Sequence, residues 1–181
     1  MTSNIFPVFS ISNDQIVGDE QLGSKEKFWF RQSGSLWLFK EVRVIEKSGV
    51  IVPTGEDWAE KVAAEIAHLM NIPAATVELA EFEGRWGCAS LNFTSPAQQL
   101  MHGNEVMAGY LKGYDPEMRF QQSSHTVENI IKAIRAMFPK ANEHRTVLRQ
   151  LASYLVLDAL IGNTDRHHEN WGLLWQVLVN I

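Results

Sequence analysis

The stretch Gly162–Trp171 reads GNTDRHHENW and follows an apolar run that ends at Gly162. It places an aspartate, a glutamate, two histidines and two asparagines in one short segment. Loops that are held by rigid elements carry a large share of reactive side chains, so this segment is the first candidate for a functional site. A solvated connector rich in turn-forming residues is the alternative interpretation of the same composition.

The spacing of Asp165 and Asn170, five positions apart, is that of the catalytic loop of protein kinases. In that loop an aspartate accepts the proton of the substrate hydroxyl, and an asparagine holds a metal ion on the ATP phosphates. A metal site built from His167, His168, Asp165 and Glu169 is a second interpretation. Adjacent histidines point in different directions, however, and no two histidines here flank a glutamate at i, i+4, as zinc hydrolase helices require.

Length and composition limit the class of protein. A chain of 181 residues is long enough for one domain or for two small lobes that share a cleft. Its formal charge of -5 offers no basic excess for phosphate contacts, so we expect no direct nucleic-acid binding. Cys88 is the single cysteine, which favours a reducing cytosol and a buried, inert thiol. No signal peptide or membrane-spanning run is apparent, so the expected location is cytoplasmic, without membrane contact.

The first half of the sequence favours strands. Four runs are rich in aromatic and β-branched residues: Lys27–Phe30, Leu36–Val44, Thr76–Phe82 and Trp86–Leu91. Turn-forming residues 32–35 and 83–85 should join them in pairs as hairpins. Between the hairpins we expect a helix from its N-cap Thr54 to about Met70, with an apolar stripe that begins at Trp58. This order predicts an antiparallel sheet with one helix packed on it.

The second half favours helices. Residues 94–122 are expected to form a linker with irregular or short helical segments. Thr126 should cap one helix, and Asn142 a longer one that ends at Gly162, with its last turns buried on all sides. Leu173 and Leu174 suggest a short strand. The fold class is therefore α+β, with a sheet lobe over residues 1–94 and a partial helical lobe over residues 95–181.

The kinase interpretation requires further parts elsewhere in the chain. Phosphoryl transfer needs a strand lysine, a helix glutamate that orients it, and a flexible turn over the phosphates. Lys40 is the strand lysine, Glu60 is the helix glutamate, and Gly23-Ser24-Lys25 is the candidate turn. Three other carboxylates on the same helix are rivals for the role of the glutamate: Glu56, Asp57 and Glu65. An ordinary solvated face that carries Glu60 and Lys61 is the alternative interpretation of this helix.

The segment Asp158–Trp171 closely resembles the catalytic loop of HipA-like serine/threonine kinases, with the pattern N-x-D-x-H-x-x-N. Gly55–Ala67 is similar to the helix of that family's N-terminal lobe, and Gly23–Trp29 is similar to the loop and strand before its ATP lysine. HipA proteins are toxins of bacterial toxin-antitoxin systems, and the wider group includes CtkA-type kinases. The resemblance implies a protein-kinase-like fold.

The resemblance also implies roles for individual residues. Asp165 would be the catalytic base, and Asn170 would hold Mg2+. Lys40 would bind the α- and β-phosphates of ATP, face Asp165 across one cleft and pair with Glu60. Further contacts to the nucleotide would come from the phosphate turn and from the backbone of a hinge within Cys88–Phe93: Gly23, Ser24, Lys25, Ser90, Leu91, Asn92 and Phe93. His167 would hold the shape of the loop, and Arg166 receives no role.

The expected activity is ATP-dependent phosphoryl transfer to a serine or threonine hydroxyl of a protein. Kinases also use a second metal-binding aspartate after the catalytic loop, but residues 171–181 contain no acid. We therefore expect that the rest of the C-terminal lobe is missing and that this chain binds nucleotide weakly or does not turn over. Two alternatives remain open: a non-catalytic, pseudokinase-like module that binds an antitoxin-like partner, and an enzyme related to lipid kinases.

Overall fold

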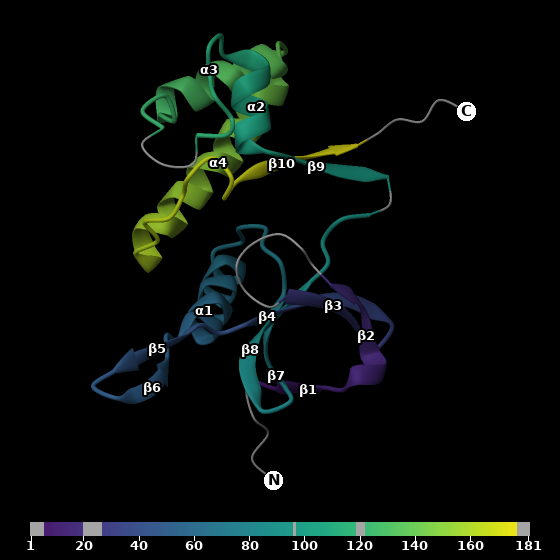
Figure 1. The fold of residues 1–181 in the computed structure, drawn as a ribbon. Coiled ribbons are helices and arrows are strands. Elements are labelled where there is room, and N and C mark those ends of the chain that lie inside the picture. Colours follow the sequence, from purple (N-terminus) through teal and green to yellow (C-terminus); the bar gives the residue numbers. More distant parts are fainter. Residues whose placement is uncertain (1–5, 20–26, 96, 119–121, 177–181) are drawn as a thin grey trace. The chain divides into compact units, whose positions relative to one another are not determined.

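Tight turns of the type X-Gly shape the first half of the chain. The computed structural model describes residues 6–19, 27–95, 97–118 and 122–176 (Figure 1). In it, both residues of Ser33-Gly34, Ser48-Gly49 and Glu83-Gly84 have positive φ. This is the geometry of type I′ turns, whose twist matches that of the flanking strands. The hairpins expected around residues 32–35 and 83–85 are confirmed, and the turn at Ser48-Gly49 adds one that the sequence analysis did not predict.

The hairpins join β3 (Lys27–Gln32) to β4 (Ser35–Glu41), β5 (Val44–Lys47) to β6 (Val50–Pro53), and β7 (Val77–Phe82) to β8 (Arg85–Leu91). The prediction of one strand over Leu36–Val44 is wrong at its end, because β4 stops at Glu41 and Val44 starts the separate β5–β6 sheet. Two strands that were not predicted, β1 (Val8–Ile11) and β2 (Ile16–Asp19), flank the short 3-10 helix η1 (Asn13–Gln15).

The main sheet is curled. Its six strands follow the order β1-β7-β8-β4-β3-β2, so the consecutive strands β1 and β2 lie at opposite edges. A flat sheet of this size would separate its edge strands by about 24 Å, whereas the chain from Ile11 to Ile16 reaches at most about 18 Å. The short connection therefore requires curvature. Because β1 pairs with β7 in parallel, the expectation of a purely antiparallel sheet is corrected at this edge.

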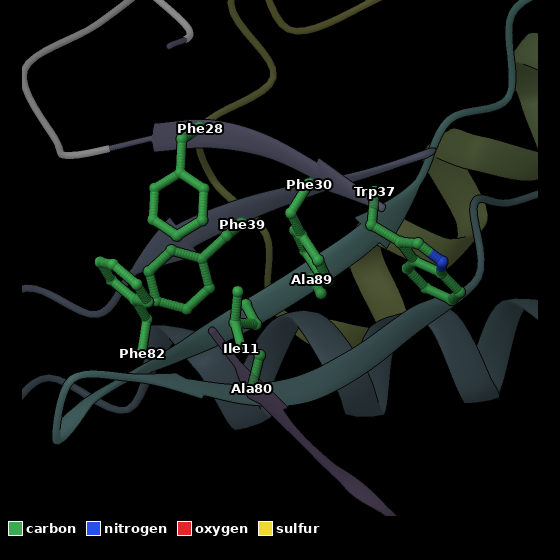
Figure 2. Close-up of a cluster of buried hydrophobic side chains, with 8 residues drawn as sticks. All are labelled: Ile11, Phe28, Phe30, Trp37, Phe39, Ala80, Phe82 and Ala89. Carbon is green, nitrogen blue, oxygen red and sulfur yellow. The ribbon is translucent and has the colours of Figure 1, made fainter. Parts of the chain in front are cut away.

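The curled sheet encloses an aromatic core. Figure 2 shows the side chains of this core gathered between the strands, where Phe28, Phe39 and Phe82 pack with ring centroids 4.8–6.3 Å apart. The other members are Ile11, Phe30, Trp37, Ala80 and Ala89. Phe28 and Phe30 alternate with Trp29 and Arg31 along β3, as the period of two in a strand requires. Because these core side chains occupy one face of β4 and β8, the side chains that alternate with them point to the opposite face of the sheet.

Helix α1 (Glu56–Leu69) packs on the outer face of β7 and β8. Its N-cap is Gly55 at φ 79°, so the prediction that Thr54 is the cap is wrong. The predicted apolar stripe is also wrong, because Trp58 is exposed and the buried residues are Lys61, Ala64 and Ala67. Two alanines let the helix approach the sheet closely. Lys61 is tolerated there because it pairs with Glu65 at 2.7 Å and Glu78 at 2.9 Å.

In the C-terminal unit, Thr94–Ile181, the described residues form three helices and a two-stranded sheet. Its elements are β9 (Gln98–His102), α2 (Gly103–Tyr110), α3 (Val127–Met137), α4 (Ala141–Ile161) and β10 (Gly172–Gln176). Thr126 caps α3 as predicted, since its side chain accepts the N–H of Asn129. α4 follows Lys140, so the prediction that Asn142 is its cap is wrong. The strand around Leu173 and Leu174 is confirmed and pairs with β9 in antiparallel fashion.

The core of this unit is formed by α2 and α3 with support from α4 and β10. Its buried residues are Val106, Met107, Tyr114, Ile130, Ala133 and Ile134. The expectation that the end of α4 is buried on all sides is wrong, because Val156 and Leu160 are exposed while Leu157 and Asp158 are buried. Among the described helices of the chain, none is both long and apolar enough to cross a membrane.

Candidate functional site

The two residues at the centre of the loop motif, Asp165 and Asn170, lie in direct contact. The side-chain amide of Asn170 donates to the main-chain carbonyl of Asp165 at 2.6 Å and to its Oδ2 at 3.1 Å. The N–H of Asp165 donates to Oδ1 of Asn163 at 3.1 Å. The carboxylate of Asp165 nevertheless stays 79% exposed. The loop thus presents a carboxylate to solvent from a fixed backbone.

Arg166 and Asp158 anchor this loop to the end of α4. The Arg166 guanidinium donates from Nε and Nη2 to the buried Asp158 carboxylate, each at 2.7 Å, and from Nη1 to the carbonyl of Asn170 at 2.6 Å. Asn163 donates to the same carboxylate at 2.8 Å. Burial raises the pKa of Asp158, but the hydrogen bonds from Arg166 and Asn163 outweigh it and lower the pKa overall. Sequence reasoning gave Arg166 no role, although its charge beside an acid in the preceding helix was a usable signal.

His168 anchors the other side of the loop. Its ring is 1% exposed, and its Nδ1 is hydrogen-bonded to the Tyr114 hydroxyl at 2.8 Å. Trp171, three positions after His168, donates from Nε1 to Nε2 of His125 at 3.0 Å. His167 contacts its own loop, since its Nδ1 accepts the N–H of Glu169 at 3.3 Å and its Nε2 lies 3.8 Å from Oδ1 of Asp165. His168 therefore ties the loop to the rest of the unit, a role that the sequence analysis did not assign to it.

The first residues of α2 complete the support of the loop. The N–H of Gly103 donates to the carbonyl of Trp171 at 2.7 Å, and the N–H of Asn104 donates to the carbonyl of His168 at 2.8 Å. These N–H groups belong to the unpaired first turn of a helix, which needs acceptors from outside the helix. A Cβ on Gly103 would meet the Trp171 ring and lie 2.6 Å from the His168 carbonyl oxygen. Only glycine lets the helix approach this closely.

The alternative metal site is contradicted. Within residues 6–19, 27–95, 97–118 and 122–176, no three His, Cys, Asp or Glu side chains gather closely enough to hold a metal ion. The proposed ligands are separated by burial, because His168 points into the core beside Tyr114 while Asp165 points to solvent. A site made only of His167, His168, Asp165 and Glu169 does not form.

In the N-terminal unit, Lys40 of β4 forms an ion pair with Glu60 of α1. Two of the three rivals are engaged elsewhere: Glu56 pairs with Arg43 at 3.3 Å, and Glu65 pairs with Lys61. Burial lowers the pKa of Lys40, but the charge and hydrogen bond of Glu60 raise it more, so the net pKa is raised. The ammonium is therefore charged at neutral pH, and 31% of the Lys40 side chain remains exposed to a ligand.

Cross-strand register places further residues beside Lys40. Lys27 of β3 and Cys88 of β8 are its direct partners on either side. Directly opposed residues of an antiparallel pair project to the same face, so these three side chains form a row across the sheet. Gly87 lets the two strands approach at this point, because a Cβ there would meet the Lys40 carbonyl oxygen and lie 2.7 Å from the Phe39 ring.

The predicted hinge residues Ser90, Leu91, Asn92 and Phe93 lie at the end of β8 and just beyond it. Some of their N–H groups are already used, since Leu91 donates to Thr76 and Asn92 donates to Leu36. Phe93 is 57% exposed, and its N–H has no acceptor within the described part of the chain. Gly23, Ser24 and Lys25, the predicted phosphate turn, lie outside the described residues.

Comparison with known proteins places these features in a family. The model of the HipA-like C-terminal domain matches residues 21–180, and the chain belongs to that family. The solved structure of the Helicobacter pylori proinflammatory kinase CtkA is similar, with a TM-score of 0.71 at 17% sequence identity. The similarity covers 94% of this chain and 56% of the CtkA chain, and it shows that the α+β fold is kinase-like. No curated protein matches the sequence.

Proposed function

We propose that this chain carries the nucleotide site and the catalytic loop of an ATP-dependent serine/threonine protein kinase of the HipA-like type. The observation that supports this most directly is the pairing of Lys40 with Glu60 on a kinase-like fold, since this pair selects one helix carboxylate out of four candidates. The braced Asp165–Asn170 loop supplies the second half of the machinery. That Lys40 and Asp165 face one cleft stays a prediction.

Asp165 is the proposed general base. It accepts the proton of a protein serine or threonine hydroxyl whose oxygen is to be phosphorylated. Its exposure suits contact with a second macromolecule, and its hydrogen bond with Asn170 holds the carboxylate in place. The substrate class in this proposal is a protein, and an antitoxin-like partner and a cytoplasmic location follow from the family resemblance alone.

Lys40 is the proposed contact to the α- and β-phosphates, and Glu60 keeps its ammonium in position. At the hinge, Ser90, Leu91, Asn92 and Phe93 are proposed to line the adenine. The N–H of Phe93 is the donor best suited to bond the base, because those of Leu91 and Asn92 are bonded within the sheet. Gly23, Ser24 and Lys25 are proposed to cover the phosphates.

The residues present fit ATP with Mg2+ provided that ligands other than Asn170 complete the coordination of the metal. Magnesium is commonly held by one or two protein ligands together with phosphate oxygens and water. The Asn170 amide nitrogen is turned to Asp165, which leaves its Oδ1 as one such ligand. When bound, ATP with Mg2+ supplies the phosphoryl group and neutralises its charge. The remaining ligands would have to come from the nucleotide, from water or from a further carboxylate.

A non-catalytic module is the second candidate. Residues 171–181 carry no carboxylate, so a second metal-binding aspartate is not present in them. A chain of this kind could bind nucleotide or a protein partner without phosphoryl transfer. Binding and transfer therefore have to be measured separately.

Titration calorimetry with Mg-ATP tests the nucleotide site. We expect binding to the wild-type chain and a loss of about tenfold or more in affinity for Lys40→Met, because a charged contact to phosphate is removed. Lys132→Met is the matched control, since it removes an exposed lysine of α3. Equal affinities for wild type and Lys40→Met would remove Lys40 from the site, and no binding to any of the three would end the nucleotide proposal.

Transfer of labelled γ-phosphate to a generic protein substrate, or to the chain itself, tests catalysis. We expect incorporation by the wild type, none by Asp165→Asn and normal incorporation by Asp115→Asn, which changes an exposed aspartate of the same unit. Binding of Mg-ATP without transfer by the wild type would favour the non-catalytic module. Equal transfer by wild type and Asp165→Asn would show that Asp165 is not the base.

A further inference from the structure

The single cysteine of the chain lies against the Lys40–Glu60 pair. Cys88 is 2% exposed, and its thiol donates to Oε2 of Glu60 at 3.2 Å, while Lys40 contacts Oε1 of the same carboxylate. Cys88 and Lys40 are direct cross-strand partners on β8 and β4, so both project toward α1. The carboxylate of Glu60 therefore links α1 to two strands, because Lys40 of β4 contacts one of its oxygens and Cys88 of β8 contacts the other.

A thiol is a weak hydrogen-bond donor, so the surroundings of Cys88 decide whether its hydrogen bond can hold the Glu60 carboxylate in place. Cys88 packs with Ala64 of α1 and Val77 of β7 in a small apolar cluster. Because the thiol is 2% exposed, water does not compete with Glu60 as the acceptor of its hydrogen bond. The carboxylate itself is about one-third exposed, so without the thiol it would have room to turn toward water.

The Cys88 thiol acts as a hydrogen-bond donor and not as a nucleophile. Burial, followed by the negative charge of Glu60, raises the pKa of Cys88 well above its ordinary range. A thiolate is the reactive form of cysteine, and it would be repelled by the adjacent carboxylate. The S–H proton is therefore retained and points to Glu60, which excludes a nucleophilic role in the folded protein.

We propose that Cys88 is a positioning residue of the nucleotide site, which holds Glu60 in the orientation that keeps the Lys40 ammonium directed at the phosphates. The effect of Cys88 on nucleotide binding rests on the proposed function, whereas the positioning of Lys40 by Glu60 and Cys88 does not. Cys88 touches neither reacting atoms nor nucleotide in this proposal. It acts only through Glu60.

The first test is spectroscopic and leaves Cys88 unchanged. The S–H stretching band in the infrared arises from one thiol, because the chain has one cysteine. We expect the band to shift to higher frequency in Glu60→Ala, because the acceptor is lost, and to stay in place in Glu65→Ala, a control on the same helix. A band that is the same in wild type and Glu60→Ala would overturn the proposal.

The second test follows Lys40 itself. The rate at which an amine reagent labels Lys40 as a function of pH, mapped by mass spectrometry, gives its apparent pKa. We expect a lower pKa in Cys88→Ala, because a mobile Glu60 attracts the ammonium less on average, and recovery in Cys88→Ser, which restores a donor. Val77→Ala removes bulk from the same cluster without touching Glu60 and should leave the pKa unchanged. A pKa in Cys88→Ala equal to that of the wild type would overturn the proposal.

Titration with Mg-ATP then separates the two proposals. We expect Cys88→Ala to weaken nucleotide binding by about three- to tenfold, the effect of one hydrogen bond, and Cys88→Ser to restore it. If the wild type binds no nucleotide while the Lys40 pKa shifts as expected, the proposed function fails and the positioning by Cys88 stands. If nucleotide binds equally to wild type and Cys88→Ala and the Lys40 pKa is unchanged, the positioning fails and the function stands. Thermal melts of each variant show that it is folded.

Discussion

The guanidinium of Arg166 donates two hydrogen bonds of 2.7 Å to the carboxylate of Asp158, eight positions earlier in the chain. A third bond from the same group reaches the carbonyl of Asn170 at 2.6 Å. One side chain therefore connects the last full turn of α4 to the far end of the loop. Asp165 lies between Asp158 and Asn170 in the sequence. Its position therefore depends on Arg166, which has no proposed part in phosphoryl transfer.

Replacing Asp158 by Asn should loosen the loop. The substitution keeps the size of the side chain but leaves the partly buried Arg166 without its counter-charge, and we expect the C-terminal unit to lose about 1–3 kcal/mol in stability. Urea unfolding gives the loss, and hydrogen exchange of residues 158–171 should become faster. Asp115→Asn, at an exposed position, is the control and should change neither. Unchanged exchange in Asp158→Asn would show that the pair does not hold the loop.

The same pair predicts a pH dependence of stability. Hydrogen bonds from Arg166 and Asn163 lower the pKa of Asp158 in the folded chain despite its burial. A depressed carboxyl pKa contributes stability that is present above the ordinary value of about 3.9 and is lost as the pH falls through the folded-state pKa. Below about pH 4 the wild type should therefore lose stability more steeply than Asp158→Asn. Parallel curves of melting temperature against pH for the two proteins would contradict this assignment.

Replacing Tyr114 by Phe should affect the loop through His168. The change removes one hydroxyl, keeps the ring and leaves the buried Nδ1 of His168 without its partner. Leaving a buried polar group unpaired costs about 1–3 kcal/mol, so we expect a loss in that range in urea unfolding. Tyr110→Phe, at an exposed position of α2, is the matched control and should lie within experimental error of the wild type. A neutral Tyr114→Phe would mean that the hydrogen bond contributes nothing net.

Two glycines of α2 should respond in opposite directions to alanine. Alanine stabilises a helix by about 1 kcal/mol relative to glycine, and Gly109 has nothing within 4 Å of an added Cβ, so Gly109→Ala should be stabilising. At Gly103 the added Cβ would meet the Trp171 ring and the His168 carbonyl, so Gly103→Ala should be destabilising and should displace the loop. Melting temperatures and tryptophan fluorescence measure both effects. Stabilisation by both variants would show that the contact at Gly103 is easily relieved.

Local sequence signals predicted much of the secondary structure. The turns at Ser33-Gly34 and Glu83-Gly84 were predictable because glycine tolerates the positive φ that a type I′ turn needs. The end of α4 at Gly162 followed from the same property, and the Thr126 cap followed from its hydroxyl. The spacing of Asp165 and Asn170 marked one short loop as a candidate catalytic loop, although the hydrogen bonds between the two residues were not predicted. Each of these depends on residues that are close in sequence.

The errors arose where distant residues decide the outcome. The apolar stripe of α1 was assigned to the face with Trp58, but Trp58 is exposed and the helix instead buries Ala64 and Ala67, whose small side chains allow close packing on the sheet. The buried Lys61 could not be expected without its cross-element partner Glu78. β1 and β2 were missed because each is only four residues long and is stabilised by pairing with β7 and β3. Propensity alone is too weak to reveal strands of this length.

The sequence alone determined two of the three hairpins, the helices α1, α3 and α4, and the loop that carries Asp165 and Asn170, because short-range turn chemistry and periodicity act within a few residues. The tertiary structure decided that Glu60 forms the ion pair with Lys40, that Cys88 bonds the same carboxylate, and that Arg166 and His168 brace the loop. These contacts join residues on different elements. Which side chain becomes a partner depends on strand register and on the close approach that Gly87 and Gly103 permit, and neither is encoded in local spacing.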